Sequence, residues 1–311
     1  MQLHGILVPL ITPFDATGAV DLNALQALAT RAIESGADGL VALGTTGESS
    51  TLSADERDAV VRTCAAITRR AGVPLLVGAG SNDTCATTEA VRHVAGLGAD
   101  AALVVVPYYS RPNHTGLIEH FRYVADRSPL PVVVYNVPHR TGVRLQAPAL
   151  LALAAHPRIV GVKQSVGSID NDTIALLTCA PDDFAVLGGE DAQLAPMLML
   201  GAAGGITACA NVAPRAYRAL ADACGAQQLT TARALSASLV GVVEVLLGHP
   251  NPTMIKAVLA AQGLLPCAHV RLPLTTPPTQ DVVAAVETIA RCGELMRVDG
   301  LAGAHSAGVR R

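Results

Sequence analysis

The chain has 311 residues, 50% of them hydrophobic and 15% charged, so it is long enough for one large buried core or two domains and is far from a disordered composition. The formal net charge is −3 and no basic cluster is present. This balance argues against nucleic acid as a partner and gives no reason to expect a membrane surface as one.

The first segment, MQLHGILVPLITPF, has no basic lead-in and runs directly into a strand-like apolar stretch. We therefore predict no signal peptide or targeting sequence, and a cytoplasmic protein. No run of about 18 uncharged apolar residues follows, so we predict no membrane span. The seven cysteines are scattered without the spacing of a zinc site, which indicates buried thiols in a reducing compartment.

Short apolar runs bounded by Gly, Pro or Asp recur eight times, at 5–12, 39–44, 74–80, 101–107, 131–136, 159–164, 184–189 and 204–210. Segments with helical apolar spacing, such as 21–36 and 54–72, lie between them. This alternation predicts parallel βα units. Eight such units favour the α/β class and a closed (β/α)8 TIM barrel over residues 1–210, because an open doubly wound sheet usually has about six strands.

Local signals mark several helix ends. Ser53 followed by Glu56 is a capping-box pattern, and Gly72 and Gly98 stand where a left-handed C-terminal residue is expected. After residue 211 only helical patterns remain, at 214–224, 230–248, 252–263 and 280–296. We therefore expect a C-terminal helical extension over 211–297 and a flexible Gly/Ala-rich tail over 298–311.

Enzymes built on this barrel carry their active residues at the C-terminal ends of the strands. The residues at or just after the ends of the apolar strands include Thr45, Thr46, Tyr109, Tyr135, Arg140, Lys163, Gly188 and Ile206. Three of the five tyrosines stand at the fourth and fifth strand ends, at 108, 109 and 135. For Tyr108, the alternative to a role in the active site is packing at an interface.

Lys163 is the main candidate for catalysis. The 22 basic residues comprise 20 arginines and two lysines, and arginine cannot lose its proton to become an amine nucleophile. A lysine in an apolar barrel mouth has its pKa lowered by desolvation, so its neutral amine can attack a carbonyl and form a Schiff base. The protonated imine is an electron sink, and Tyr135, with Thr45 and Tyr109, is the natural proton shuttle for it.

The segment GTTGES, residues 44–49, predicts a carboxylate cradle. Its glycines permit a tight turn, and Thr45 and Thr46 offer hydroxyl donors, whereas the spacing of a nucleotide-binding loop is missing. Arg140 supplies a fork for a second carboxylate, with a surface salt bridge as the alternative. Glu48 could buttress the loop or touch substrate, and we expect a solvated or structural role for Lys256. No metal or cofactor is expected, since the nine histidines lack ligand spacing.

The stretches GTTGES, PYYSRP, YNVPHRTG, GVKQS, GGITACANVAP and RLP resemble the dihydrodipicolinate synthase / N-acetylneuraminate lyase family of class I, pyruvate-dependent aldolases, over about residues 3–296. The double threonine and the arginine of YNVPHRTG resemble the branch that condenses pyruvate with L-aspartate 4-semialdehyde to 4-hydroxy-tetrahydrodipicolinate for lysine biosynthesis. The resemblance implies a TIM barrel, small-molecule substrates, no cofactor beyond the pyruvate imine, and a homotetramer or homodimer.

The resemblance also implies residue roles. Lys163 forms the pyruvate imine, and Tyr135 relays protons with Thr45 and with a Tyr109 that reaches in from the neighbouring subunit. Thr46 and Ile206 contact pyruvate, Arg140 holds the aldehyde's carboxylate, and we place Gly188 with the substrate-binding residues. In lysine-inhibited members the inhibitor meets a Glu and two His, and these positions fall at Ala86, Ala54 and Arg57, which argues against lysine feedback here.

Two alternatives remain open from the sequence. The first is a catabolic aldolase or dehydratase acting on a 2-oxo-3-deoxy sugar acid or hydroxy-oxo acid through the same imine. The second is a non-catalytic scaffold that binds pyruvate. Gln164, where synthases commonly have Glu or Asp, is the feature that points to the scaffold and leaves the local lining of the site undecided.

Overall fold

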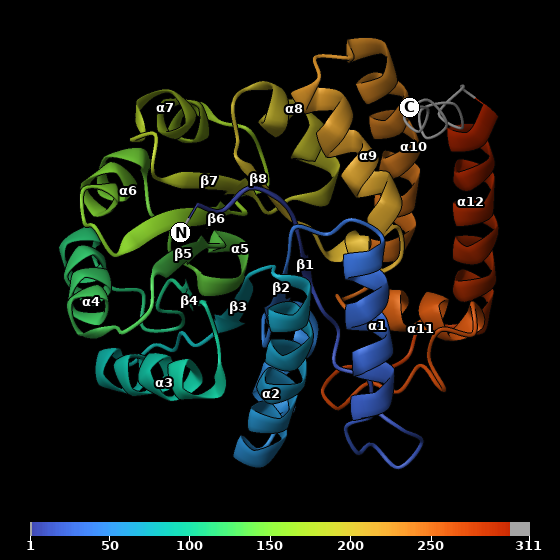
Figure 1. Ribbon diagram of the computed structural model, residues 1–311, viewed down its shortest axis with the longest axis horizontal. Coiled ribbons are helices and arrows are strands. Elements are labelled where there is room, and N and C mark those ends of the chain that lie inside the picture. Colours follow the sequence, from blue (N-terminus) through green and yellow to red (C-terminus); the bar gives the residue numbers. More distant parts are fainter. Residues whose placement is uncertain (1, 299–311) are drawn as a thin grey trace, which may run out of the picture.

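The computed structural model of the protein describes residues 2–298 and shows a closed barrel of eight parallel strands in sequence order, with β8 pairing back to β1 (Figure 1). The strands are β1 (Gly5–Pro9), β2 (Gly39–Ala42), β3 (Leu75–Gly78), β4 (Ala101–Val105), β5 (Val132–Asn136), β6 (Ile159–Gln164), β7 (Ala185–Gly188) and β8 (Gly204–Ile206). Each lies within one of the eight predicted apolar runs. The predicted (β/α)8 TIM barrel is therefore confirmed.

The helices that follow the strands, except the short α5, pack around the outside of the barrel (Figure 1). They are α1 (Leu22–Glu34), α2 (Ala54–Ala71), α3 (Thr84–Leu97), α4 (His114–Arg127), α6 (Ala147–Ala154), α7 (Asn171–Cys179) and α8 (Leu194–Met199). The four-residue helix α5 (Pro138–Thr141) follows β5 directly and lies at the barrel mouth. The capping box at Ser53 is formed in both directions, and Gly72 and Gly98 end α2 and α3 in the left-handed region, as predicted. Local caps therefore fix where these helices begin and end.

The hydrophobic core has two layers because side chains alternate along each strand. One layer fills the inside of the barrel with residues such as Leu7, Val41, Leu76 and Val133. The other, larger layer lies between the strands and the helices. A strand buried on both faces needs a nearly continuous apolar run, which is the pattern in the sequence.

Glycines close the barrel where its first and last strands meet. Gly5 pairs with Gly204, and a Cβ added to Gly204 would lie 2.0 Å from the carbonyl oxygen of Gly5. Gly5 also has a φ of 71°, in the left-handed region that favours glycine. The seam between β1 and β8 therefore depends on the absence of two side chains.

The C-terminal extension consists of α9 (Pro214–Gly225), α10 (Leu229–Leu247), α11 (Thr253–Ala261) and α12 (Thr279–Val298). Figure 1 shows α9, α10 and α12 side by side at one edge of the barrel, and the helices pack directly on one another. The predicted tail lies outside the described residues from residue 299 onward.

Among the described helices, α10 alone has the length and mean hydropathy to cross a membrane. Core helices of folded domains meet the same criteria, so this is weak evidence. In the structure α10 packs against α9 and α12, and six of its apolar side chains are buried.

Of the two roles expected for Lys256, the structure shows the structural one and not the solvated one. Its side chain in α11 is fully buried and forms an ion pair with Glu48, the residue after the first turn of the GTTGES loop. Glu48 therefore buttresses that loop, one of the two roles considered for it.

His120 is a buried ionisable group outside the barrel mouth. Its ring on α4 is 5% exposed and its Nδ1 lies 2.9 Å from the Thr84 hydroxyl of α3. Its Nε2 is buried and has no hydrogen-bond partner in the described part of the chain. Burial lowers the pKa of His120 from 6.5 to about 4, although the charge of Asp83 acts in the opposite direction. The fold therefore holds this ring in its neutral form.

We expect the free energy of unfolding to fall as the pH drops from 6.5 towards 4, because the unfolded chain binds a proton at His120 that the folded chain excludes. The loss attributable to this ring is on the order of 3 kcal/mol at its limit. His120→Gln keeps a neutral polar group and should flatten the profile in this window. The urea midpoint of each protein, measured at several pH values, tests this expectation. The same dependence of the midpoint on pH in the wild type and in His120→Gln would contradict the assignment.

Candidate active site

Lys163 and Tyr135 are neighbours across two paired strands. Tyr135 of β5 is in register with Lys163 of β6, and both side chains point into the barrel. The Lys163 Nζ lies 4.4 Å from the centre of the Tyr135 ring, and the two residues are 8% and 7% exposed. The amine therefore stands beside a phenol in a place that little water reaches.

A cavity of about 420 Å³, here called the lysine cavity, opens at this end of the barrel. It brings together six of the predicted site residues, namely Thr45, Thr46, Tyr135, Arg140, Lys163 and Ile206. They come from four different parts of the barrel: the loop after β2, the end of β5 with the following α5, β6, and β8. The strand-end rule therefore predicted residues of which most lie together in one cavity.

Two predicted residues do not line the lysine cavity. Gly188 is buried at the end of β7, whereas the next residue, Gly189, lines the cavity. A Cβ on Gly189 would lie 3.1 Å from Cε of Lys163 and 1.9 Å from Oγ of Ser165, so this glycine leaves room for the lysine. Tyr109 is 89% exposed with a φ of 69°, and Tyr108 is 40% exposed. Within one chain Tyr109 therefore does not reach Lys163.

The GTTGES loop is held in place from both sides. Thr45–Gly47 forms a single 3-10 turn, and the hydroxyl of Thr12 donates to the carbonyl oxygen of Gly47 at 2.7 Å. Nδ2 of Asn251 donates to Oγ1 of Thr46 at 3.0 Å. Because that hydroxyl accepts from Asn251, its own proton remains available to an acceptor in the cavity. The turn can therefore present a hydroxyl donor to a carboxylate.

An acidic wall faces the lysine. Asp191 is 6% exposed and accepts hydrogen bonds from the backbone N–H groups of Ala208 and Cys209 and from the hydroxyl of Tyr217. Burial raises the pKa of Asp191, although these backbone bonds and the charge of Lys163 act in the opposite direction. Glu190 also lines the cavity, and its Oε1 is buried without a partner among the described residues.

Sequence reasoning missed the contribution of the extension. The last residue of α10, Leu247, and the four residues after it, Gly248 to Asn251, line the lysine cavity, as do Ser165, Asp191 and Ala208. For Asn251 the only local signal was a polar NP pair before a helical pattern, which predicts a turn and not a site. The extension therefore completes the cavity and does not merely follow the barrel.

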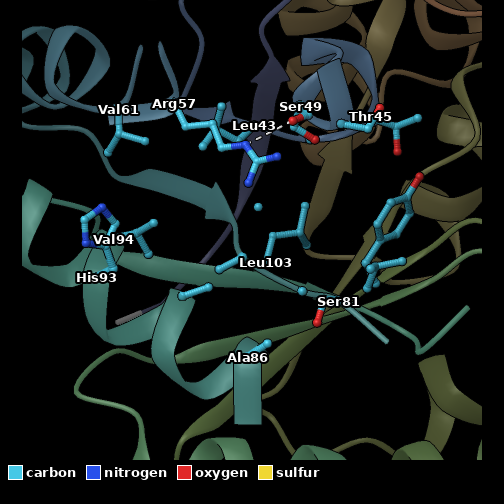
Figure 2. Close-up of a pocket in the computed structure, with 18 of the residues that line it drawn as sticks. Leu43, Thr45, Ser49, Arg57, Val61, Ser81, Ala86, His93, Val94 and Leu103 are labelled. Atoms are coloured by element: carbon cyan, nitrogen blue, oxygen red, sulfur yellow. Dashed lines mark hydrogen bonds between the residues drawn. The ribbon is translucent and has the colours of Figure 1, made fainter. Parts of the chain in front are cut away.

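A second cavity of about 640 Å³, here called the side cavity, adjoins the first between the strand ends and the helices α2 and α3. Thr45, Tyr135 and Arg140 line both cavities. Figure 2 shows the guanidinium of Arg57 pointing into the side cavity, with Nε donating to the carbonyl oxygen of Ser49 at 3.2 Å.

The three positions that bear on lysine feedback, Ala54, Arg57 and Ala86, all line the side cavity. They present two methyl groups and a cation there. His93 and Asp58 also line this cavity, and Nε2 of His93 lies 2.7 Å from Oδ1 of Asp58. The Asp58 carboxylate therefore already has a basic partner.

Gln164 lies outside both cavities. It follows Lys163 on β6, so its side chain points away from the barrel interior, and it is 3% exposed. Its Oε1 accepts from Nδ2 of Asn136 at 3.0 Å, and its Nε2 donates to the hydroxyl of Thr173 at 3.2 Å. This departure from the family pattern therefore changes no cavity wall and removes the feature that pointed to a non-catalytic scaffold.

Within residues 2–298 no group of three or more His, Cys, Asp or Glu side chains is arranged to hold a metal ion. The polar groups of the lysine cavity are instead one amine, one phenol, hydroxyls, carboxylates and a guanidinium. This set suits the binding of a small 2-oxo acid and proton transfer to and from it.

Comparison with known proteins agrees with the fold and with this chemistry. A sequence model of the dihydrodipicolinate synthetase family matches residues 2–291. The 4-hydroxy-tetrahydrodipicolinate synthases of Syntrophus aciditrophicus and Hyphomonas neptunium are 42% and 43% identical over 88% and 89% of this chain, and over 92% and 94% of their own lengths. The solved structure of the corresponding synthase from Methylacidiphilum fumariolicum superposes with a TM-score of 0.90, at 34% identity over 96% of this chain and 98% of that one.

We expect Gln164→Leu to lower the free energy of unfolding by about 1–3 kcal/mol, because the hydroxyl of Thr173 and one Asn136 N–H lose their buried partner. Urea denaturation measures the loss. Thr173→Val is the matched control, because it removes only the hydrogen bond between Gln164 and Thr173 and leaves the one between Gln164 and Asn136 in place. Pyruvate should still be trapped on Lys163 by borohydride, since the cavity is unchanged. A folded variant that forms no adduct would contradict this assignment.

Proposed function

The chain belongs to the dihydrodipicolinate synthetase family, and from this membership and the geometry of the lysine cavity we propose that it condenses pyruvate with L-aspartate 4-semialdehyde to 4-hydroxy-tetrahydrodipicolinate. The observation that carries the proposal is the buried amine of Lys163 beside Tyr135, opposite the threonine cradle. The same relatives favour this reaction over a catabolic aldolase.

In the first step the neutral amine of Lys163 attacks the C2 carbonyl of pyruvate. The cradle of Thr45 and Thr46 holds the pyruvate carboxylate through hydroxyl and backbone donors, while Ile206 closes the apolar side. The carbinolamine then loses water to give the protonated imine. Tyr135, which adjoins the amine, supplies the proton that the leaving hydroxyl needs.

The imine acts as the electron sink, so no separate cofactor is needed. A proton leaves the C3 methyl group of the bound pyruvate, and the electron pair shifts to the imine nitrogen to give an enamine. Tyr135 and Thr45 both line the cavity and can pass this proton between them and out of the site. The enamine carbon is then the nucleophile for the second substrate.

The enamine carbon attacks the aldehyde carbon of the second substrate, a new C–C bond forms, and the enamine nitrogen becomes an imine again. The proton relay of Tyr135 and Thr45 returns a proton to the aldehyde oxygen, which becomes the hydroxyl group of the product. Arg140 on α5 reaches both cavities and is placed to hold the carboxylate of this substrate in a bidentate pair. The substrate's own amine then attacks the imine carbon, closes the ring and displaces Lys163. The enzyme is regenerated with its free amine.

We place the enzyme in the biosynthesis of lysine through diaminopimelate, as the names of its relatives suggest. We propose that it works in the cytoplasm. We also propose a homodimer or homotetramer, in which Tyr109 of the partner subunit completes the proton relay. The support for this arrangement is the exposed Tyr109 at the rim of the barrel mouth, in a backbone conformation that is unusual for a residue with a side chain.

The proposed reaction predicts a covalent adduct at one residue. Borohydride added in the presence of pyruvate should reduce the imine and add the mass of the reduced adduct to the peptide containing Lys163. Lys163→Arg should give no adduct, because a guanidinium does not form the imine. Purified enzyme should also consume pyruvate in the presence of L-aspartate 4-semialdehyde.

Two controls separate the classes of function. Cleavage of 2-oxo-3-deoxygluconate tests the catabolic alternative under the same conditions. Arg140→Met should keep the pyruvate adduct but lose at least about tenfold in kcat/KM for the semialdehyde, since one bidentate carboxylate pair is removed. An enzyme that forms no pyruvate adduct would disprove the proposed chemistry.

The subunit arrangement predicts complementation between one variant that is slowed and one that is inactive. Tyr109→Phe should slow turnover at least about tenfold, the lower range for loss of one proton-transfer group. Unfolding and refolding it together with Lys163→Arg should restore activity, because hybrid dimers contain one site with both wild-type residues. Random pairing restores about a quarter of the wild-type sites. No recovery in verified hybrid dimers would show that Tyr109 acts only within its own chain.

A further inference from the structure

The second of the two lysines is buried behind the cradle. Lys256 of α11 is fully buried, and its Nζ forms an ion pair with Oε1 of Glu48 in which both side chains are 1% exposed. The same Nζ donates to the carbonyl oxygen of His269 at 3.0 Å and lies 3.9 Å from the centre of the Phe14 ring. The ammonium therefore has a partner on every side and no contact with solvent.

Glu48 is bonded as completely as its partner. While Oε1 accepts from Lys256, Oε2 accepts from the backbone N–H of Arg271 at 3.0 Å. The backbone carbonyl of Glu48 accepts from the N–H and the hydroxyl of Thr51. A buried charge pair of this kind is strongly destabilising when only one partner is removed, so both residues depend on each other.

Glu48 lies directly behind the residues that face pyruvate. It follows the single turn Thr45–Gly47, and its backbone N–H donates to the carbonyl oxygen of Thr45. Its φ of 50° and ψ of 34° are left-handed, a conformation that a residue with a side chain holds only when its surroundings impose it. The ion pair with Lys256 is one such restraint, and it holds the side chain of the left-handed residue itself.

The extension touches the cradle at a second point. Asn251, two residues before α11, donates to the hydroxyl of Thr46, and Lys256 within α11 holds Glu48. One contact is made at the middle of the turn and the other directly after it, and both come from one short segment far away in sequence. Burial lowers the pKa of Lys256 to about 8, against the effect of the Glu48 charge, so the ammonium relies on that carboxylate.

We propose that Lys256 and Glu48 are positioning residues that hold the Thr45–Thr46 cradle against the pyruvate carboxylate, so that the C-terminal extension sets the enzyme's affinity for its 2-oxo acid. This inference rests on the proposed function, in which the cradle binds pyruvate. Neither residue lines the lysine cavity, and the pair acts only through the position of the two threonines.

The test compares wild-type enzyme with the double variant Lys256→Met/Glu48→Gln, which removes both charges together and leaves no unpaired ion in the core. The half-saturating pyruvate concentration should rise about tenfold, in both steady-state turnover and borohydride trapping, while kcat at saturating pyruvate stays within about twofold. A residue that only stabilises the fold would not separate these two quantities.

Lys256→Gln/Glu48→Gln is the milder variant, because two neutral amides can keep a hydrogen bond between these positions and no ion is left unpaired. It should raise the half-saturating concentration about threefold, and it provides the test if the Met/Gln variant does not fold. Circular dichroism and urea denaturation establish folding first. A folded variant with the wild-type half-saturating concentration, or with a lower kcat alone, would overturn the proposal.

Arg218→Met is the matched control. It removes an ion pair between α9 and Asp38, which also joins the extension to the barrel but at the opposite end, where β2 begins. Pyruvate saturation should remain as in the wild type, whereas a tenfold rise would show that any loosening of the extension has this effect and would overturn the proposal. Absence of any adduct in the wild type would instead reject the proposed function itself.

Discussion

The alternation of side chains along two paired strands is the constraint on which the site depends. Tyr135 and Lys163 are in register and point inward, while the next residues, Asn136 and Gln164, are in register and point outward. The inner pair carries the chemistry, and the outer pair ties the two strands together by an amide hydrogen bond. One register fixes both pairs, since a slip by one residue would exchange the two faces.

The two lysines show how the same side chain serves different purposes in different surroundings. Lys256 is enclosed by a carboxylate, a carbonyl and an aromatic face, so its charge is fully compensated. Lys163 forms no ion pair among the described residues and lies beside a phenol and an open cavity. Arginine provides the other Lys/Arg side chains of the chain, but it would not replace either lysine. The space around Lys256 is already filled by its partners, and the chemistry at Lys163 needs a free amine.

Much of the fold and of the site could be predicted because the relevant signals are local. Eight apolar runs predicted eight strands, and the rule that barrel enzymes act at strand ends gathered Thr45, Tyr135 and Lys163 into one cavity. The apolar run predicts Gly188 at the site, whereas Gly189 lines the cavity, because a strand pattern does not fix the last residue of the strand. Lys256, Glu48 and Asn251 could not be placed, since their contacts join residues 205 or more positions apart and leave no periodic trace.

The glycine seam has a consequence for how the protein forms in the cell. The pairing of Gly5 with Gly204 joins the first strand to the last, so β1 keeps an open edge until nearly two thirds of the chain has left the ribosome. Contacts this distant in sequence close slowly, because the loop entropy must be lost before they form. The exposed edge of a nascent half-barrel is therefore the point at which a chaperone or a neighbouring nascent chain competes with correct closure.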